Sequence, residues 1–165
     1  MAALALLLVD SVFGQPKAPS PVFRPALKEI QSSTQVPIRL PSRLPSVIPE
    51  NSIKLVTGQT RGDGYFIALY LSKSASNASY AAGFGADVAV SKDPSETPNV
   101  ALSGGRAAIF SPVSCGGSCA PANLWWEEHG VTYQIQIRLR PDSDERDQQR
   151  ILIETANSMV IVPRE

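Results

Sequence analysis

The two cysteines are the sharpest chemical feature of this sequence. Cys115 and Cys119 enclose Gly-Gly-Ser, and these glycines let the backbone bend so that the two Cα atoms can approach each other. In an oxidising compartment such a pair forms a disulfide. The bond would close a five-residue loop and contribute about 2 kcal/mol through loop entropy. We therefore predict a structural disulfide that fixes a loop without deciding the fold.

Other chemistry at the same cysteines stays open as an alternative. A redox-active pair more usually has the spacing Cys-x-x-Cys in a βαβ unit. A zinc site needs about four ligands, whereas the chain has two cysteines and one histidine. A thiol-redox or other small enzyme that uses Cys115 and Cys119 is the second hypothesis, and the first one requires neither a metal nor a cofactor.

His129 is the only histidine, so any Ser-His-acid or Cys-His mechanism would have to use it. His129 precedes Gly130, and this pair predicts an exposed hairpin turn. The neighbouring Glu127 and Glu128 alternate between the two faces of a strand, so they do not form a paired acid and base. The sequence has no Gly-x-Ser-x-Gly, His-Glu-x-x-His or phosphate-binding loop, which favours a non-enzymatic protein.

Five residues form the candidate binding surface. Trp125 and Trp126 are adjacent in a predicted strand, so they point to opposite faces: one belongs to the core, and the other is covered by another element or is an exposed aromatic. Arg39 and Arg43 are four residues apart in an extended segment and could form a small anion-facing patch, although charges also protect sheet edges. His129 lies beside the tryptophans in the sequence.

The tripeptide Arg61-Gly62-Asp63 matches the integrin-binding sequence of adhesive proteins. It lies in a segment, 58–64, that we expect to be a turn, and Gly-Asp-Gly is also ordinary turn chemistry. An adhesion module through these residues is therefore the third hypothesis.

Composition and a possible targeting signal limit the partners and the cellular location that we expect. The chain has 15 basic and 15 acidic residues and no block of like charges, which argues against nucleic acid. The apolar run Met1–Val9 is too short to span a bilayer and is typical of the core of a signal peptide cut before Gln15, although no Lys or Arg precedes it. The alternative is an ordinary buried helix or strand. We expect an exported protein, periplasmic or extracellular, with no membrane span beyond the signal.

The segment 124–160 predicts the fold most clearly. Apolar and polar residues alternate from Val131 to Leu139, which indicates a half-buried strand of an antiparallel sheet. After Pro141, Asp142 or Ser143 can cap a helix whose apolar stripe runs from Leu152 to Val160, and Pro163 would end it. This helix should cover the apolar face of the sheet.

The run Tyr65–Leu71 is apolar at every position and predicts a strand buried on both faces, the best candidate for the centre of the sheet. Gly83 and Gly85 indicate a bulge or a close backbone approach. The expected fold is α+β: an antiparallel sheet of roughly five to seven strands with the C-terminal helix on one face and a Pro-rich N-terminal arm. We divide the chain into a signal (1–14), a Pro-rich arm with a short helix (15–33) and one domain (34–165).

Two stretches carry a resemblance to a known family. They are Val-Pro-Ile-Arg-Leu-Pro-Ser-Arg-Leu-Pro (Val36–Pro45), and Trp-Glu-Glu-His-Gly-Val-Thr-Tyr-Gln-Ile (Trp126–Ile135) followed by the helix with Ile151-Leu152-Ile153 and Ala156. Together they resemble an uncharacterised family of exported bacterial α+β domains, some found as extracytoplasmic parts of anti-sigma-factor-like or sporulation-associated proteins. The resemblance implies an antiparallel sheet and a non-enzymatic sensing or binding role. It supplies no catalytic residue.

The first hypothesis is therefore an exported, non-enzymatic binding, sensing or structural domain of the bacterial cell envelope. Its partner would be another envelope protein or a small ligand.

Overall fold

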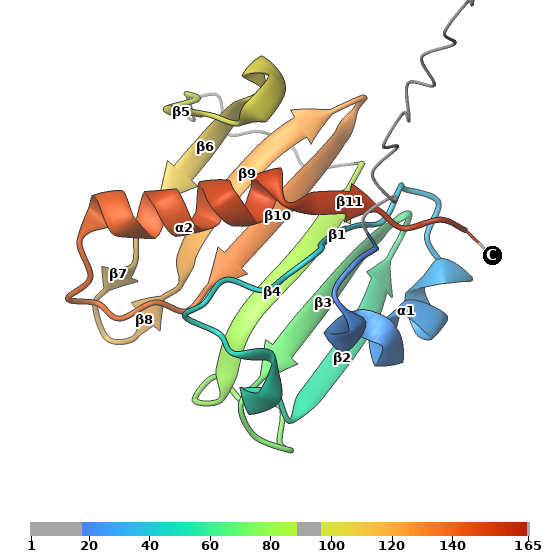
Figure 1. Cartoon of the computed structure of the whole chain (residues 1–165), viewed down its shortest axis with the longest axis horizontal. Coiled ribbons are helices and arrows are strands. Elements are labelled where there is room, and N and C mark those ends of the chain that lie inside the picture. The colour runs from blue at the N-terminus through green and yellow to red at the C-terminus, as the bar shows by residue number, and fades with distance from the viewer. Residues whose placement is uncertain (1–17, 89–96, 165) are drawn as a thin grey trace, which may run out of the picture.

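The fold is built on one seven-stranded antiparallel sheet. Figure 1 shows the computed structural model, which describes residues 18–88 and 97–164; the signal-like segment 1–14 lies outside these residues. The strand order is β2-β3-β4-β10-β9-β6-β5. The strands are β2 (Leu55–Arg61), β3 (Gly64–Tyr70), β4 (Tyr80–Asp87), β5 (Val100–Ala101), β6 (Ala107–Ser111), β9 (Ala122–Glu128) and β10 (Val131–Ile137). The prediction of an α+β fold with an antiparallel sheet is confirmed.

Strand β10 lies at the centre of the sheet, between β4 and β9. Its residues alternate between buried and half-buried from Val131 to Ile137, as the sequence predicts. His129 (φ 52°) and Gly130 (φ 75°) both have positive φ, which is the geometry of a type I′ hairpin turn. The β9–β10 hairpin at the centre of the sheet is therefore formed by residues that are adjacent in the chain.

The prediction that Tyr65–Leu71 forms the central strand is wrong in position. Strand β3 is second from one edge of the sheet. It is apolar on both faces: Ile67 and Leu69 lie in the core, while Ala68 is buried and Phe66 and Tyr70 are half-buried on the other face. A continuous apolar run therefore does not determine the place of a strand in the sheet order.

Helix α2 (Glu145–Asn157) packs against β9 and β10. Its cap is Asp144, whose Oδ1 accepts hydrogen bonds from the backbone N–H of Arg146 (2.8 Å) and Asp147 (3.4 Å). The predicted caps, Asp142 and Ser143, lie two positions and one position too early. The helix also ends earlier than predicted. Met159–Ile161 forms strand β11, which pairs with β1 (Arg39–Pro41), because β-branched residues fit a strand better than a helix end.

The N-terminal segment is packed from Ser20 onward and does not form a free arm. It folds as the 3-10 turn η1 (Pro21–Phe23) and helix α1 (Arg24–Gln31). Phe23 is fully buried and makes an edge-to-face contact with Phe84 of β4, with ring centroids 5.3 Å apart. The backbone N–H of Ser20 donates to the carbonyl of Pro41 (3.0 Å). This segment therefore belongs to the same core as the sheet.

The expected turn over 58–64 is mostly strand. β2 extends to Arg61 and β3 begins at Gly64, so the turn itself is Gly62-Asp63, with Gly62 at φ 55°. The carbonyl of Asp63 accepts from the backbone N–H groups of Gln35 (3.3 Å) and Val36 (3.4 Å). Ordinary turn geometry accounts for these residues, and adhesion through Arg61-Gly62-Asp63 stays a prediction.

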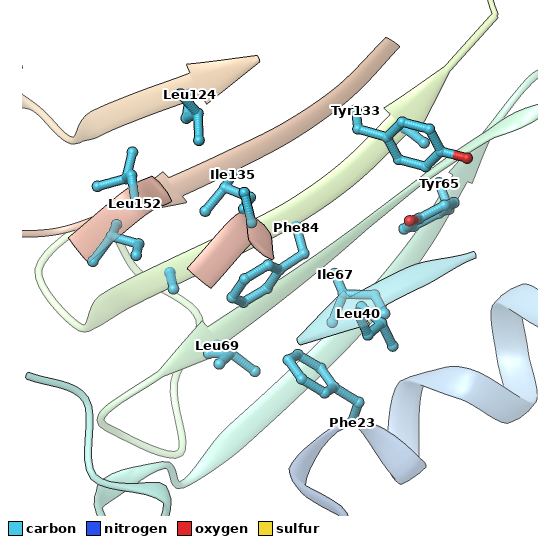
Figure 2. Close-up of a cluster of buried hydrophobic side chains, with 14 of the residues drawn as sticks. Phe23, Leu40, Tyr65, Ile67, Leu69, Phe84, Leu124, Tyr133, Ile135 and Leu152 are labelled. Carbon is cyan, nitrogen blue, oxygen red and sulfur yellow. The ribbon is translucent and has the colours of Figure 1, made fainter. Parts of the chain in front are cut away.

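The helices and the β1–β11 ribbon lie on the same face of the sheet, as Figure 1 shows. Figure 2 shows the core that they enclose: Leu152 of α2 lies near Leu124 and Ile135, and Phe23 lies near Ile67. No helix in the described part of the chain covers the opposite face, which we call the open face. The shorter elements are η2 (Glu50–Ser52), η3 (Ser103–Gly105) and the ribbon β7 (Ser114–Cys115) and β8 (Cys119–Ala120). Within residues 18–88 and 97–164, no helix has the length and apolar character to cross a membrane.

Helix α1 approaches β2 closely at Gly58. A Cβ at this position would lie 2.9 Å from Ile30 Cγ2 and 3.1 Å from the carbonyl oxygen of Ala26. We therefore expect Gly58→Ala to lower the free energy of unfolding by about 1–3 kcal/mol, because α1 must move outward. Denaturant unfolding measures the change. Gly116→Ala is the control, since its Cβ would meet no atom within 4 Å, and equal stability of the two variants would contradict the prediction.

Candidate binding face of the sheet

The cysteine pair forms the predicted disulfide. Cys115 and Cys119 are bonded across the β7–β8 ribbon, with their Cα atoms 4.0 Å apart. The residues around the bond are exposed. The described residues contain no free cysteine and no group of three or more His, Cys, Asp or Glu that could hold a metal ion. The disulfide therefore constrains the conformation of an exposed loop.

His129 is exposed in the β9–β10 turn. The two acids that precede it point to opposite faces, as expected. Glu128 lies on the covered side, where it pairs with arginines, and Glu127 is exposed. The turn therefore does not bring His129 and a pair of carboxylates together on one face.

Trp126 lies in the core, so it is not part of an exposed binding surface. It is 3% exposed and stacks on Tyr133, with centroids 5.5 Å apart. The guanidinium of Arg39 lies 5.4 Å from the centroid of the Tyr133 ring, and that of Arg106 lies 6.0 Å from the centroid of a Trp126 ring. Burial also raises the pKa of the Tyr133 hydroxyl, so this group is neutral at ordinary pH.

Glu128 joins the two arginines of this cluster. Its Oε1 accepts from Arg39 Nη2 and its Oε2 accepts from Arg106 Nη1 at 3.2 Å. The side chains of Arg39, Arg106 and Glu128 are 16%, 25% and 19% exposed. Among the described residues, Arg39 Nε and Trp126 Nε1 have no hydrogen-bond acceptor, so ion pairs and ring stacking hold the cluster together.

The expected anion-facing pair of Arg39 and Arg43 is not assembled. Arg39 lies in β1 and is engaged by Glu128, whereas Arg43 follows a bend after β1 and lines a groove with Val47, Arg150 and Glu154. The chain is not extended from one arginine to the other, which is the assumption that the sequence argument required.

Trp125 is the candidate residue that reaches the open face. It is half-buried and lines a hollow of about 380 Å³. The other lining residues include Gln59, Phe66, Thr132, Gln134 and Gln136, with Arg61 and Asp87 as the charged groups. A volume of this size lies within the range of roughly 300–1,000 Å³ that is typical of small-ligand sites.

One glycine of β4, Gly85, lines this hollow, and Gly83 lies on the same face of the strand. Gly83 and Gly85 of β4 face Gln136 and Gln134 of β10 across the sheet. The ring of Phe66 lies over both glycines, because a Cβ at Gly83 would lie 2.3 Å from Phe66 Cζ and a Cβ at Gly85 would lie 2.9 Å from Phe66 Cδ2. The predicted close approach at these glycines is thus made by the aromatic side chain of Phe66.

Two amides in the hollow are held in a fixed orientation. Gln134 Nε2 donates to Asn123 Oδ1 at 3.1 Å, and the Tyr80 hydroxyl donates to Gln136 Oε1 at 3.0 Å. Burial raises the pKa of Tyr80, so its hydroxyl keeps the proton that it donates. These two bonds do not use Gln134 Oε1 and Gln136 Nε2, which offer one acceptor and two donors to a ligand.

Sequence reasoning found Trp125 but missed Phe66, Gln134 and Gln136. The alternating pattern of β10 did contain a signal for Gln134 and Gln136, because every polar residue of an alternating strand must lie on the face opposite the core. The register that brings Phe66 to the glycines of β4 could not be obtained from local pattern alone. No protein-family model, curated protein or solved structure showed a significant match to this chain.

The disulfide should stabilise its loop and little else. Replacing Cys115 and Cys119 together by alanine should lower the free energy of unfolding by about 2 kcal/mol or less, since the closed loop is short. Thermal unfolding of the variant, compared with the unreduced protein, measures this loss. A variant that fails to fold would show that the bond decides the fold, contrary to this prediction.

Glu128 should matter more than an exposed acid. Glu128→Gln leaves two partly buried arginines without a counter-charge, and we expect a loss of about 1–3 kcal/mol in the free energy of unfolding. Glu154→Gln is the matched control, because it removes an ion pair to Arg150 whose side chains are 57% and 63% exposed; it should cost less than about 0.5 kcal/mol. Urea unfolding of both variants measures the two losses. A smaller loss in the free energy of unfolding for Glu128→Gln than for Glu154→Gln would contradict the expectation.

Proposed function

We propose that this protein is an exported, non-enzymatic binding domain of the bacterial envelope that holds a ligand on the open face of its sheet. One observation carries the proposal: the helices of residues 18–88 and 97–164 cover one face of the sheet, and the other face has a hollow of about 380 Å³ with a half-buried tryptophan and oriented amides. Concave sites with aromatic side chains and a few fixed polar groups are typical of ligand binding.

Three features support a binding role over catalysis. The two cysteines are joined in a disulfide, so they offer no thiolate nucleophile. His129 lies in an exposed turn, and it is absent from the lining of the hollow. The hollow itself is lined mainly by amide, hydroxyl and aromatic side chains, which bind by hydrogen bonding and packing.

The disulfide is also compatible with an oxidising, exported location. A sensing role of the kind that the family resemblance implies would use the same open face. In that case the ligand would be met outside the cytoplasm, by the face of the sheet that the helices leave uncovered.

The proposal predicts that ligands will stabilise the protein through Trp125. The whole chain is screened by thermal unfolding against four classes of compound: amino acids and short peptides, nucleotides, neutral oligosaccharides, and detergents. At least one class should raise Tm, by about 5–10 °C when the ligand is at 100 times its Kd. Trp125→Ala should abolish the shift because it removes the largest side chain of the hollow.

Ile161→Ala is the control, since Ile161 is exposed on β11, on the helix side of the sheet. It should keep the full shift. A screen in which no class raises Tm, or in which Trp125→Ala and Ile161→Ala respond equally, would overturn the proposal.

A further inference from the structure

The charge of the hollow narrows the class of ligand. Its charged lining residues, Arg61 and Asp87, have opposite signs. Both lie beside Gly64, because Arg61 pairs with Gly64 across the β2–β3 hairpin and the Asp87 Cα lies 3.2 Å from a Cβ built there. The rest of the hollow is neutral. A phosphate or another strong anion would find no cluster of cations in it, whereas an uncharged ligand meets no mismatch.

The hydrogen-bonding groups of β10 suit hydroxyls. Gln134 and Gln136 are two residues apart on one face of the strand, which places them about 7 Å apart. Asn123 and Tyr80 fix the two amides so that Gln134 offers an oxygen and Gln136 offers an amino group. A hydroxyl both donates and accepts, so a ligand with several hydroxyls can satisfy both groups in one pose.

The aromatic groups suit a flat ring with C–H groups on its face. Trp125 is the direct cross-strand neighbour of Gln134, and Phe66 lies on the other side over Gly83 and Gly85. Both rings are half-buried. An extended peptide would instead pair with a free sheet edge through its main chain, and a lipid chain would leave the amides unsatisfied.

We propose that the ligand is a neutral carbohydrate, bound across β10 between Trp125 and Phe66 with its hydroxyls on Gln134 and Gln136. This inference rests on the proposed function and names the substrate class of the same site. Pyranose rings have apolar faces and hydroxyl edges, and they match the alternation of aromatic and amide groups in the hollow.

The test is a titration of the whole chain with three neutral oligosaccharides, cellotetraose, chitotetraose and maltotetraose. Isothermal calorimetry gives Kd, and tryptophan fluorescence reports contact at Trp125. Tetraglycine and AMP are the comparison probes for a peptide and an anion. We expect saturable binding of at least one oligosaccharide with a change in fluorescence, and no binding of tetraglycine or AMP at the same concentrations.

Variants then locate the site. Gln134→Ala and Gln136→Ala should each raise Kd by about 3–10-fold, the range for one lost hydrogen bond. Trp125→Ala should raise it by more than 10-fold, while Trp125→Phe should recover part of the affinity. Gln35→Ala, which removes an exposed glutamine outside the hollow, should leave Kd unchanged. A cooperative thermal unfolding transition shows that each variant is folded.

The outcomes separate the two proposals. If no oligosaccharide binds but a compound of another class stabilises the protein through Trp125, the carbohydrate inference is wrong and the proposed function stands. If no compound of any class acts through Trp125, both are wrong. Oligosaccharide binding that is unaffected by Trp125→Ala, Gln134→Ala and Gln136→Ala would also overturn the inference, because the sugar would then bind elsewhere.

Discussion

The alternation of apolar and polar side chains along β10 is the constraint on which the rest of the structure depends. Because successive side chains of a strand point to opposite faces, Val131, Tyr133, Ile135 and Ile137 commit one side of the central strand to the core. The same geometry places the intervening polar residues, Thr132, Gln134 and Gln136, on the opposite face. The core and the hollow are thus two results of one pattern, and a slip of one residue in register would exchange them.

Local pattern predicted the features that depend on neighbouring residues. The β9–β10 hairpin, the opposite directions of Trp125 and Trp126, and the Cys115–Cys119 disulfide all follow from residues close together in the chain. The exact helix cap could not be predicted in this way. Asp142, Ser143 and Asp144 are all good caps, and only the direction of the chain after β10 selects the last of them.

Features that depend on contacts between distant segments of the chain could not be predicted from local sequence patterns. Met159 and Val160 fit the helical stripe of α2, yet they form β11 because β1 supplies a partner from the other end of the domain. Arg39 and Arg43 could be paired only by assuming an extended chain, and Glu128 engages Arg39 instead. The hollow combines β2, β3, β4, β9 and β10, so its shape needs the strand order and register as well as the polar pattern.

The β1–β11 ribbon has a consequence for the timing of folding. It joins a strand near the start of the described chain to one near its end, so its backbone pairing has the longest loop to close and forms late. During synthesis, the sheet can assemble while the segment around β1 still lacks this partner. Pairing with β11 therefore fixes the segment around β1 late in folding, and a chain in which β11 is unpaired keeps this N-terminal segment exposed to proteases.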